Sequence, residues 1–393
     1  MNEHKESILI KNAVIYLEEQ VLENASLLIE EGVITKISKK ESIMVSKQAV
    51  VIDASKLIVI PGFIDSHIHG ASGYDVMDAT EEALNEIASS LPKEGVTSFL
   101  ATTMTQAPEN IEKALMNAAE YINKPQYAEM LGIHLEGPFI NKVKAGAQPK
   151  QYIVKPNILQ FQRWQKLAKE KIKTITLAPE LDPDGTFINY LLNERINVSA
   201  GHTDASFNQI KSAVEHGVRQ LTHLCNAMNG IHHRDIGAVG AAFLLHDLRS
   251  ELIADGIHVS SDMLQIIYNN IGSERIILIT DAMRAKGLGP GEYDLGGQIV
   301  KVTNNRAKLE DGTLAGSILC MQDAAKHMLS FQDVTIRDLI KMTSANVAKQ
   351  LSIYDRKGSI EEGKDADLLL VDDEFTIHYT ICRGQIAYRS EHL

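Results

Sequence analysis

Histidines and carboxylic acids recur in this chain in short polar motifs. In DSHIHG, His67 and His69 alternate, and alternate residues of a strand face the same side, so both imidazoles can bind one ion. A lone buried histidine is usually a hydrogen-bonded core residue, so the joint pattern matters more than any one member. Imidazole nitrogens and carboxylate oxygens together are typical ligands of zinc, iron and manganese. The further motifs are HLEGP with Glu136, APE with Glu180, AGHTD with His202 and Asp204, THLCNAM with His223 and Asn226, ADGIH with Asp255 and His258, and TDAM with Asp281.

Eight apolar runs, most of them followed by such a motif, predict the strands that position these residues. They lie at 59–65, 97–101, 130–135, 174–178, 197–200, 220–224, 251–254 and 276–279, and most intervals have the period of an amphipathic helix. This alternation predicts an α/β fold of the (β/α)8 TIM-like barrel type. The C-terminal strand ends of such a barrel share one face, so the motifs should converge there. An open doubly wound sheet is the alternative, which the lack of a glycine-rich phosphate loop disfavours.

The two ends of the chain consist of short β-branched segments separated by glycine and aspartate. They occupy 8–17, 25–30 and 33–38 near the start, and 358–363, 366–372, 375–379 and 386–388 near the end. We expect both ends to pair into one discontinuous β-sandwich domain. The predicted domains are therefore 1–59 and 352–393 for the small β domain and 60–351 for the barrel.

Composition excludes several classes of partner. The 393 residues include 39 Lys and Arg against 51 Asp and Glu, and the net charge of −12 argues against nucleic acid or an anionic membrane. A small anionic substrate is still compatible, because a local cationic spot can bind it. The three cysteines form no C-x-x-C pair, and no apolar run reaches the ~20 residues of a membrane span. We expect a cytoplasmic protein.

The order of the motifs resembles that of a known family, the N-acetylglucosamine-6-phosphate deacetylases of the amidohydrolase superfamily. The resemblance covers essentially the whole chain. Its first motif marks the superfamily, whereas HLEGPF and THLCNAMNG are more specific. It implies a metal-dependent hydrolase that converts N-acetylglucosamine 6-phosphate to glucosamine 6-phosphate and acetate. The motifs are PGFIDSHIHG, HLEGPFIN, GHTDAS, THLCNAMNGIHHR, ADGIHV, TDAM and LAGS, with a late GKDADLLLVD segment.

The same resemblance implies catalytic and metal-binding roles. Asp281 matches the catalytic aspartate, which would accept the proton of the attacking water and deliver it to the departing amine. One or two divalent ions, Zn, Fe or Mn, would be bound in each subunit. Retention of the His-x-His pair favours two ions, with Glu136 between them. The matching metal ligands are His67, His69, Glu136, His202 and His223.

Substrate contacts are implied for the loops around the pocket. Arg234, in an HHR cluster, matches the phosphate-binding arginine, and His258 matches a histidine that reaches across a homodimer interface. One position departs from the family pattern, because Gln148 stands where many relatives have histidine. Its neutral amide can still hydrogen-bond a sugar hydroxyl or phosphate. The full set of implied substrate-binding residues is Ala147, Gln148, Asn226, Ala227, Arg234, His258, Leu314, Ala315 and Gly316.

Two other functions stay open at this point. Another amidohydrolase, such as a cyclic amide hydrolase, often bridges two metals with a carboxylated lysine, and Glu136 at that position disfavours this alternative. A catalytically inactive barrel that serves as a scaffold is the second alternative. It is disfavoured because five candidate ligands and Asp281 are retained.

Overall fold

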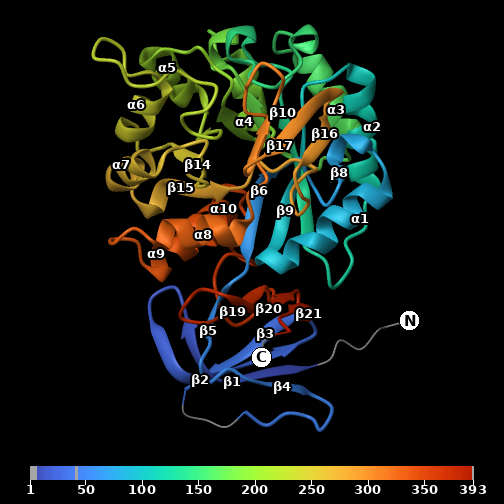
Figure 1. Cartoon of the computed structure of the whole chain (residues 1–393), viewed down its shortest axis with the longest axis vertical. Coiled ribbons are helices and arrows are strands. Elements are labelled where there is room, and N and C mark those ends of the chain that lie inside the picture. Colours follow the sequence, from blue (N-terminus) through green and yellow to red (C-terminus); the bar gives the residue numbers. More distant parts are fainter. Residues whose placement is uncertain (1–6, 40–42, 392–393) are drawn as a thin grey trace.

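The computed structural model describes residues 7–39 and 43–391 and contains the predicted barrel. Its eight parallel strands are hydrogen-bonded in the order β6-β9-β10-β11-β12-β13-β14-β15 (Figure 1). Most of their residues are buried, as expected for parallel strands that are covered on both faces. The strands are β6 Phe63–Ile68, β9 Val96–Thr103, β10 Glu129–Glu136, β11 Ile172–Leu177, β12 Asn197–Ala200, β13 Gln220–Leu221, β14 Arg249–Ile253 and β15 Ile276–Ile279.

A helix follows each barrel strand and packs on the outside of the barrel (Figure 1). Side-chain caps start several of them: the Thr80 hydroxyl accepts from Ala83 N at 3.1 Å, and Ser206 and Gln209 form a capping box. The helices are α1 Glu81–Ser90, α2 Pro108–Glu120, α3 Ile158–Leu167, α4 Thr186–Asn193, α5 Phe207–His216, α6 Gly237–Leu244, α7 Ser261–Ile271 and α8 Met321–Leu329. After α8 come α9 Ile336–Ile340, a π-helical turn at Lys341–Ala345 and α10 Asn346–Gln350.

Residues at the ends of β6 and β15 complete the closure of the barrel. Asp281 N donates to His67 O at 2.8 Å, and an isolated parallel bridge joins Ile68 to Ala282. The buried Asp65 carboxylate accepts from the Thr280 hydroxyl at 2.6 Å. This seam fixes Asp281 beside the His-x-His pair.

Both ends of the chain pair into one eight-stranded sheet below the barrel (Figure 1). Its order is β21-β20-β19-β5-β1-β2-β3, with β4 beside β1, and it encloses a core of its own. The predicted fold class, a barrel with a small β domain built from both termini, is confirmed. The predicted segment 358–363 forms no strand. The strands are β1 Ile8–Tyr16, β2 Val21–Glu30, β3 Val33–Ser38, β4 Val50–Asp53, β5 Ile58–Pro61, β19 Leu368–Val371, β20 Ile377–Cys382 and β21 Gln385–Arg389.

The first predicted strand, 59–65, is divided between the two sheets. β5 ends at Pro61 in the small sheet, and β6 begins at Phe63 in the barrel. Gly62 joins them where a Cβ atom would come within 2.3 Å of the Thr97 side chain. The close packing of the Thr97 side chain on this backbone therefore requires a glycine.

A three-stranded antiparallel sheet is inserted between β15 and α8 and lies at the C-terminal end of the barrel (Figure 1). It consists of β16 Gly291–Leu295, β17 Gln298–Thr303 and β18 Arg306–Lys308. Gln298 Nε2 donates to Ala147 O at 2.7 Å, and Gln106 Nε2 donates to Gly296 O at 2.8 Å. These bonds attach the insertion to the barrel loops that surround the site.

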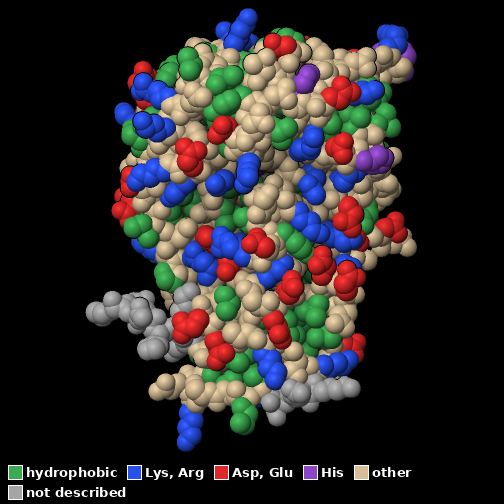
Figure 2. All heavy atoms as spheres, turned by 180° about the vertical axis from the view of Figure 1, so that it is seen from behind, with side chains coloured by type: hydrophobic (Ala, Val, Ile, Leu, Met, Phe, Trp, Pro, Cys, Tyr) green, Lys and Arg blue, Asp and Glu red, His purple; other side chains and the backbone are tan. Residues whose placement is uncertain are grey.

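Acidic and basic side chains are intermingled over the face of the molecule shown in Figure 2. The described part of this face therefore carries no single large patch of acidic side chains. Within residues 7–39 and 43–391, none of the helices has the length and apolar character that crossing a membrane would require.

Candidate active site

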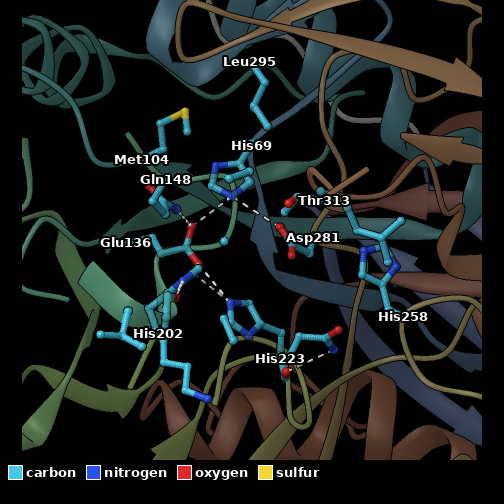
Figure 3. A pocket seen from close by; sticks show the side chains of 18 residues that line it. His69, Met104, Glu136, Gln148, His202, His223, His258, Asp281, Leu295 and Thr313 are labelled. Carbon is cyan, nitrogen blue, oxygen red and sulfur yellow. Dashed lines mark hydrogen bonds and ion pairs between the residues drawn. The ribbon is translucent and has the colours of Figure 1, made fainter. Parts of the chain in front are cut away.

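A cavity of about 340 Å³ lies between the C-terminal strand ends and the inserted sheet (Figure 3). Most residues predicted for the site line it, and His67 is buried beside them. Ala315 is buried next to the lining, and Arg234 lies on an exposed loop outside it. The predicted residues that line the cavity are His69, Glu136, Ala147, Gln148, His202, His223, Asn226, Ala227, His258, Asp281, Leu314 and Gly316.

The sequence reasoning missed six lining residues: Met104, Val143, Lys144, Gly146, Leu295 and Thr313. Leu295 carried a usable signal, because it precedes the Gly296–Gly297 turn of the β16–β17 hairpin. Both glycines have positive φ, as a two-residue hairpin turn of this kind requires. The other five lie in irregular segments without a comparable pattern.

Glu136, His202 and His223 form one group of potential metal ligands. Glu136 Oε1 lies 3.2 Å from His202 Nε2 and 3.3 Å from His223 Nε2. The two Nε2 atoms are 3.1 Å apart. All three side chains are buried, and the three ligand atoms face one point (Figure 3).

His67, His69 and Asp281 form a second group. Figure 3 shows His69 and Asp281 on the other side of Glu136 from His202. Asp281 Oδ1 lies 3.5 Å from His67 Nε2 and 3.3 Å from His69 Nε2. Glu136 Oε2 lies 3.2 Å from His69 Nε2, and Glu136 Oε1 lies 3.4 Å from His67 Nε2. The Glu136 carboxylate therefore stands between the two groups.

The backbone turns sharply where three of these residues leave their strands. His202, His223 and Asp281 each lie two residues past a strand end, with φ values of 46°, 32° and 48°. Left-handed backbone is unfavourable for residues with a Cβ atom and tends to cluster at functional sites. The turns aim all three side chains into the cavity.

The electrostatics of the site favour positive charge. Burial by itself would lower the pKa of His67, but Asp281 and Glu136 outweigh burial and raise this pKa well above its usual range. Burial likewise opposes the carboxylates that raise the pKa of His69 to about 10. Burial would raise the pKa of Glu136, yet His67 and hydrogen bonds from His202 and His223 lower it well below its ordinary value.

The residues present fit a divalent cation. His202 Nδ1 donates to Lys144 O at 2.9 Å, so Nε2 is the ring nitrogen that faces His223 and Glu136 and that would bind a cation between them. His67 Nε2 is buried and has no hydrogen-bond partner, although it faces two carboxylates. A cation would satisfy these nitrogens and oxygens together, and a mixed set of imidazole and carboxylate donors suits Zn²⁺ or a related divalent ion.

Gln148 lines the cavity and also contacts a potential metal ligand, Glu136. Its Nε2 atom donates to Glu136 Oε2 at 2.7 Å, and its Oε1 atom accepts from Thr105 N at 2.7 Å. The Gln148 side chain therefore holds the Oε2 atom of Glu136 in place (Figure 3).

The predicted interface histidine, His258, and the predicted phosphate ligand, Arg234, lie in different surroundings. His258 lines the cavity of its own chain, and its Nδ1 atom is 2.7 Å from Asp255 Oδ2. Arg234 is exposed, and its Nη1 atom lies 2.7 Å from His233 Nε2. Lys144 is the single lysine or arginine among the described residues that line the cavity.

Residues 58–387 match the Amidohydrolase family. The chain belongs to this family. The N-acetylglucosamine-6-phosphate deacetylase of Bacillus subtilis is 45% identical to it over 390 residues, or 98% of each chain. The Thermotoga maritima crystal structure of an enzyme with that name is 35% identical, with a TM-score of 0.87 over 97% of this chain and 100% of the other.

A second solved structure contains a sugar phosphate. It is a Mycobacterium smegmatis N-acetyl-D-glucosamine-6-phosphate deacetylase, an aspartate-to-alanine variant, in complex with N-acetyl-D-glucosamine-6-phosphate. It is 25% identical, with a TM-score of 0.89 over 97% of this amidohydrolase and 99% of the other chain. The predicted resemblance to the deacetylases of this family is thus confirmed.

Proposed function

We propose that this amidohydrolase hydrolyses the N-acetyl group of N-acetylglucosamine 6-phosphate to give glucosamine 6-phosphate and acetate. The observation that carries the proposal is the pair of ligand groups on either side of Glu136, with Asp281 at the cavity wall. Deacetylases of this name that match nearly the full chain support the choice of substrate.

We propose that two divalent ions, Zn, Fe or Mn, bind here. Glu136, His202 and His223 would bind one ion, and His67 and His69 would bind the second, with Glu136 between the two. Bound there, a divalent ion lowers the pKa of water and polarises an amide carbonyl.

Asp281 is the proposed general base and acid. Burial alone would raise its pKa, but His67 and His69 lower the pKa of Asp281 to about 2, so the carboxylate is ionised near neutral pH and can accept a proton. Water adds to the acetamide carbon, and its proton passes to Asp281. Asp281 then protonates the nitrogen as the C–N bond breaks, since an amine leaves readily only when protonated.

The substrate would lie between the inserted sheet and the barrel loops. Ala147, Asn226, Ala227, His258 and the 314–316 segment are the proposed contacts to the sugar, because they surround the cavity or adjoin it. Arg234 is the proposed phosphate ligand, and because it is exposed outside its own cavity, we infer that a second copy of the chain supplies it. The homodimer, the place of His258 near the partner's site and a cytoplasmic location stay predictions.

The test is metal content by elemental analysis, followed by acetate release from N-acetylglucosamine 6-phosphate and ring opening of dihydroorotate. We expect bound divalent metal, acetate release that a chelator abolishes, and no action on the cyclic amide. Asp281→Asn should retain much of the metal yet lose most turnover. Ring opening without acetate release would favour a cyclic amide hydrolase, and absence of both metal and turnover would favour a scaffold.

A further inference from the structure

A buried carboxylate that the mechanism does not use lies beneath the ligand groups. Glu251 is in β14, and its side chain is completely buried inside the barrel. Burying a carboxylate is costly unless its charge and its hydrogen-bonding capacity are satisfied. Its contacts therefore indicate what it does.

Both oxygens of Glu251 have partners. Oε2 lies 3.0 Å from His67 Nδ1, and Oε1 accepts from Gln220 Nε2 at 2.6 Å. Oε2 also accepts a longer bond, 3.4 Å, from the backbone N–H of His223. One carboxylate thus touches a residue of each ligand group.

The contact with Glu251 determines the tautomer of His67. A carboxylate accepts hydrogen bonds, so His67 Nδ1 carries the proton and donates it to Glu251. His67 Nε2 is then the ring nitrogen that a cation would bind by displacing its proton, and this atom faces Glu136 and Asp281 at 3.4 and 3.5 Å. That orientation is the one a metal-binding imidazole requires.

The other three imidazoles lack such a partner. The outer nitrogen of His202 donates to the neutral carbonyl of Lys144, and the Nδ1 atoms of His69 and His223 are buried without a hydrogen-bond partner. Within residues 7–39 and 43–391, no lysine or arginine forms an ion pair with Glu251; its ion-pair partner is His67. Among these four imidazole rings, Glu251 therefore contacts that of His67, whereas in the other group it contacts the backbone of His223.

A chain of amides holds the carboxylate in place from the opposite end of the barrel. Gln350 of α10 donates to Asn197, and Asn197 Nδ2 donates to Gln220 Oε1 at 2.9 Å. Gln220 Nε2 then donates to Glu251. In this chain each amide NH₂ group donates to the next side chain. The last NH₂ group donates to Glu251 Oε1, which leaves Oε2 to accept from His67.

We propose that Glu251 is a positioning residue that fixes His67 for a divalent ion and thereby sets the affinity of the His67–His69 group. This inference rests on the proposed metal-dependent function. Outer carboxylates of this kind orient the imidazole and raise its basicity, and their loss typically weakens metal binding by about tenfold to a hundredfold.

Glu251→Gln tests this role, because the amide has nearly the same shape but only one acceptor oxygen for three donors. The Zn²⁺ affinities of the metal-free protein are measured by competition with a coloured chelator, and thermal melting of the metal-free protein reports folding. We expect one of two binding constants to weaken by about tenfold to a hundredfold, with the melting temperature nearly unchanged. Ser250→Ala is the matched control, since Ser250 is the buried neighbour in β14 whose hydroxyl has no hydrogen-bond partner.

The outcomes separate the two proposals. A wild-type protein that binds none of Zn²⁺, Fe²⁺ and Mn²⁺ would refute the proposed function itself. Zn²⁺ binding that is the same in Glu251→Gln and wild type would refute only the positioning role. Equal weakening of both constants together with a lower melting temperature would show a general structural role and overturn the proposal as well. If Glu251→Gln fails to fold, Gln220→Met takes its place. A smaller weakening of one Zn²⁺ binding constant than expected for Glu251→Gln would support the proposal, and unchanged constants would overturn it.

Discussion

Both polar ends of the Gln148 side chain are engaged within the protein. The amide nitrogen contacts Glu136 and the amide oxygen contacts the backbone of Thr105, and the side chain is 7% exposed. From the sequence we predicted a substrate contact at this position. The contacts instead favour a role in orienting the carboxylate between the two ligand groups.

We predict that Gln148→Leu lowers kcat by about tenfold or more, because a hydrogen bond to a charged group is worth about 1.5–3 kcal/mol. The KM for the sugar phosphate should change little. Steady-state kinetics at saturating metal measure both constants. Gln165→Leu is the control, since Gln165 is equally buried but bonds only to the backbone of Ile172. A raised KM with unchanged kcat would instead restore the predicted substrate contact.

Not every acidic residue that follows a barrel strand reaches the cavity, so the sequence pattern alone does not identify the site residues. Glu180 follows β11 but accepts hydrogen bonds from Asn141, from the Thr203 hydroxyl and from Asp204 N at 2.7 Å. It joins three loops and lies outside the cavity lining. Residue type and strand position predicted Glu136 and Glu180 alike, and only the course of the loops distinguishes them.

At the scale of elements, an ion cluster joins the barrel to the small domain. The Lys357 ammonium is buried and lies 2.8 Å from Glu129 at the start of β10 and 3.0 Å from Asp365, close to β19. Asp367 is a third carboxylate on the same nitrogen. The carboxylates of these three acids are close enough to bind a cation, and the positively charged ammonium group of Lys357 occupies that position.

This cluster gives a pH-dependent prediction. Burial alone would raise the pKa of Glu129, but Lys357 and Arg356 lower it from 4.5 to about 2. A depressed carboxyl pKa contributes stability above the unfolded value, and this contribution is lost as the pH falls toward 2. Glu129→Gln should therefore reduce the free energy of unfolding by about 3 kcal/mol at pH 7 and by much less at pH 3.

Urea unfolding of the metal-free proteins at both pH values measures this difference. Glu120→Gln is the control, because Glu120 also pairs with a lysine, Lys169 at 2.6 Å, but is mostly exposed. Exposed pairs contribute little. A loss at pH 3 as large as that at pH 7 would contradict the charge-based account of the cluster.

The elements themselves were predicted unevenly. Amphipathic spacing in the sequence predicts helices at 108–121 and 206–215, and α2 and α5 lie within one residue of these ranges, because such spacing is a local property. The division at Gly62 was missed, because an unbroken apolar run looks the same in one sheet or two. The inserted sheet was missed although its Gly-Gly turn was a usable signal.

At the scale of the whole molecule, the proposed phosphate ligand, Arg234, lies outside the cavity of its own chain. Arg234 is exposed in its own chain, while the adjacent Ile231 is also 53% exposed. A closed twofold dimer would place equivalent loops reciprocally, so each chain could supply Arg234 to the other. The resemblance predicts a homodimer, but it does not indicate that Arg234 lies outside the cavity of its own chain, because that depends on the course of the 226–236 loop.

We predict that Asp281→Asn and Arg234→Ala, each poorly active alone with the sugar phosphate, regain activity in a mixed dimer. One of the two sites would then combine Asp281 of one chain with Arg234 of the other, giving up to half of wild-type turnover. The dimers are made by co-expression with two different affinity tags and purified over both. Acetate release is measured at low substrate concentration, where loss of phosphate binding is most visible.

The control is the same double purification of each variant with itself, which should give no recovery. A mixed dimer no more active than the average of these controls would mean that Arg234 acts within its own chain or not on phosphate. Lys144 then becomes the test case, as the cation of the chain's own cavity. If Lys144→Met raises the KM for the phosphorylated sugar while Arg234→Ala leaves it unchanged, phosphate is bound within one chain and the site is complete without a partner.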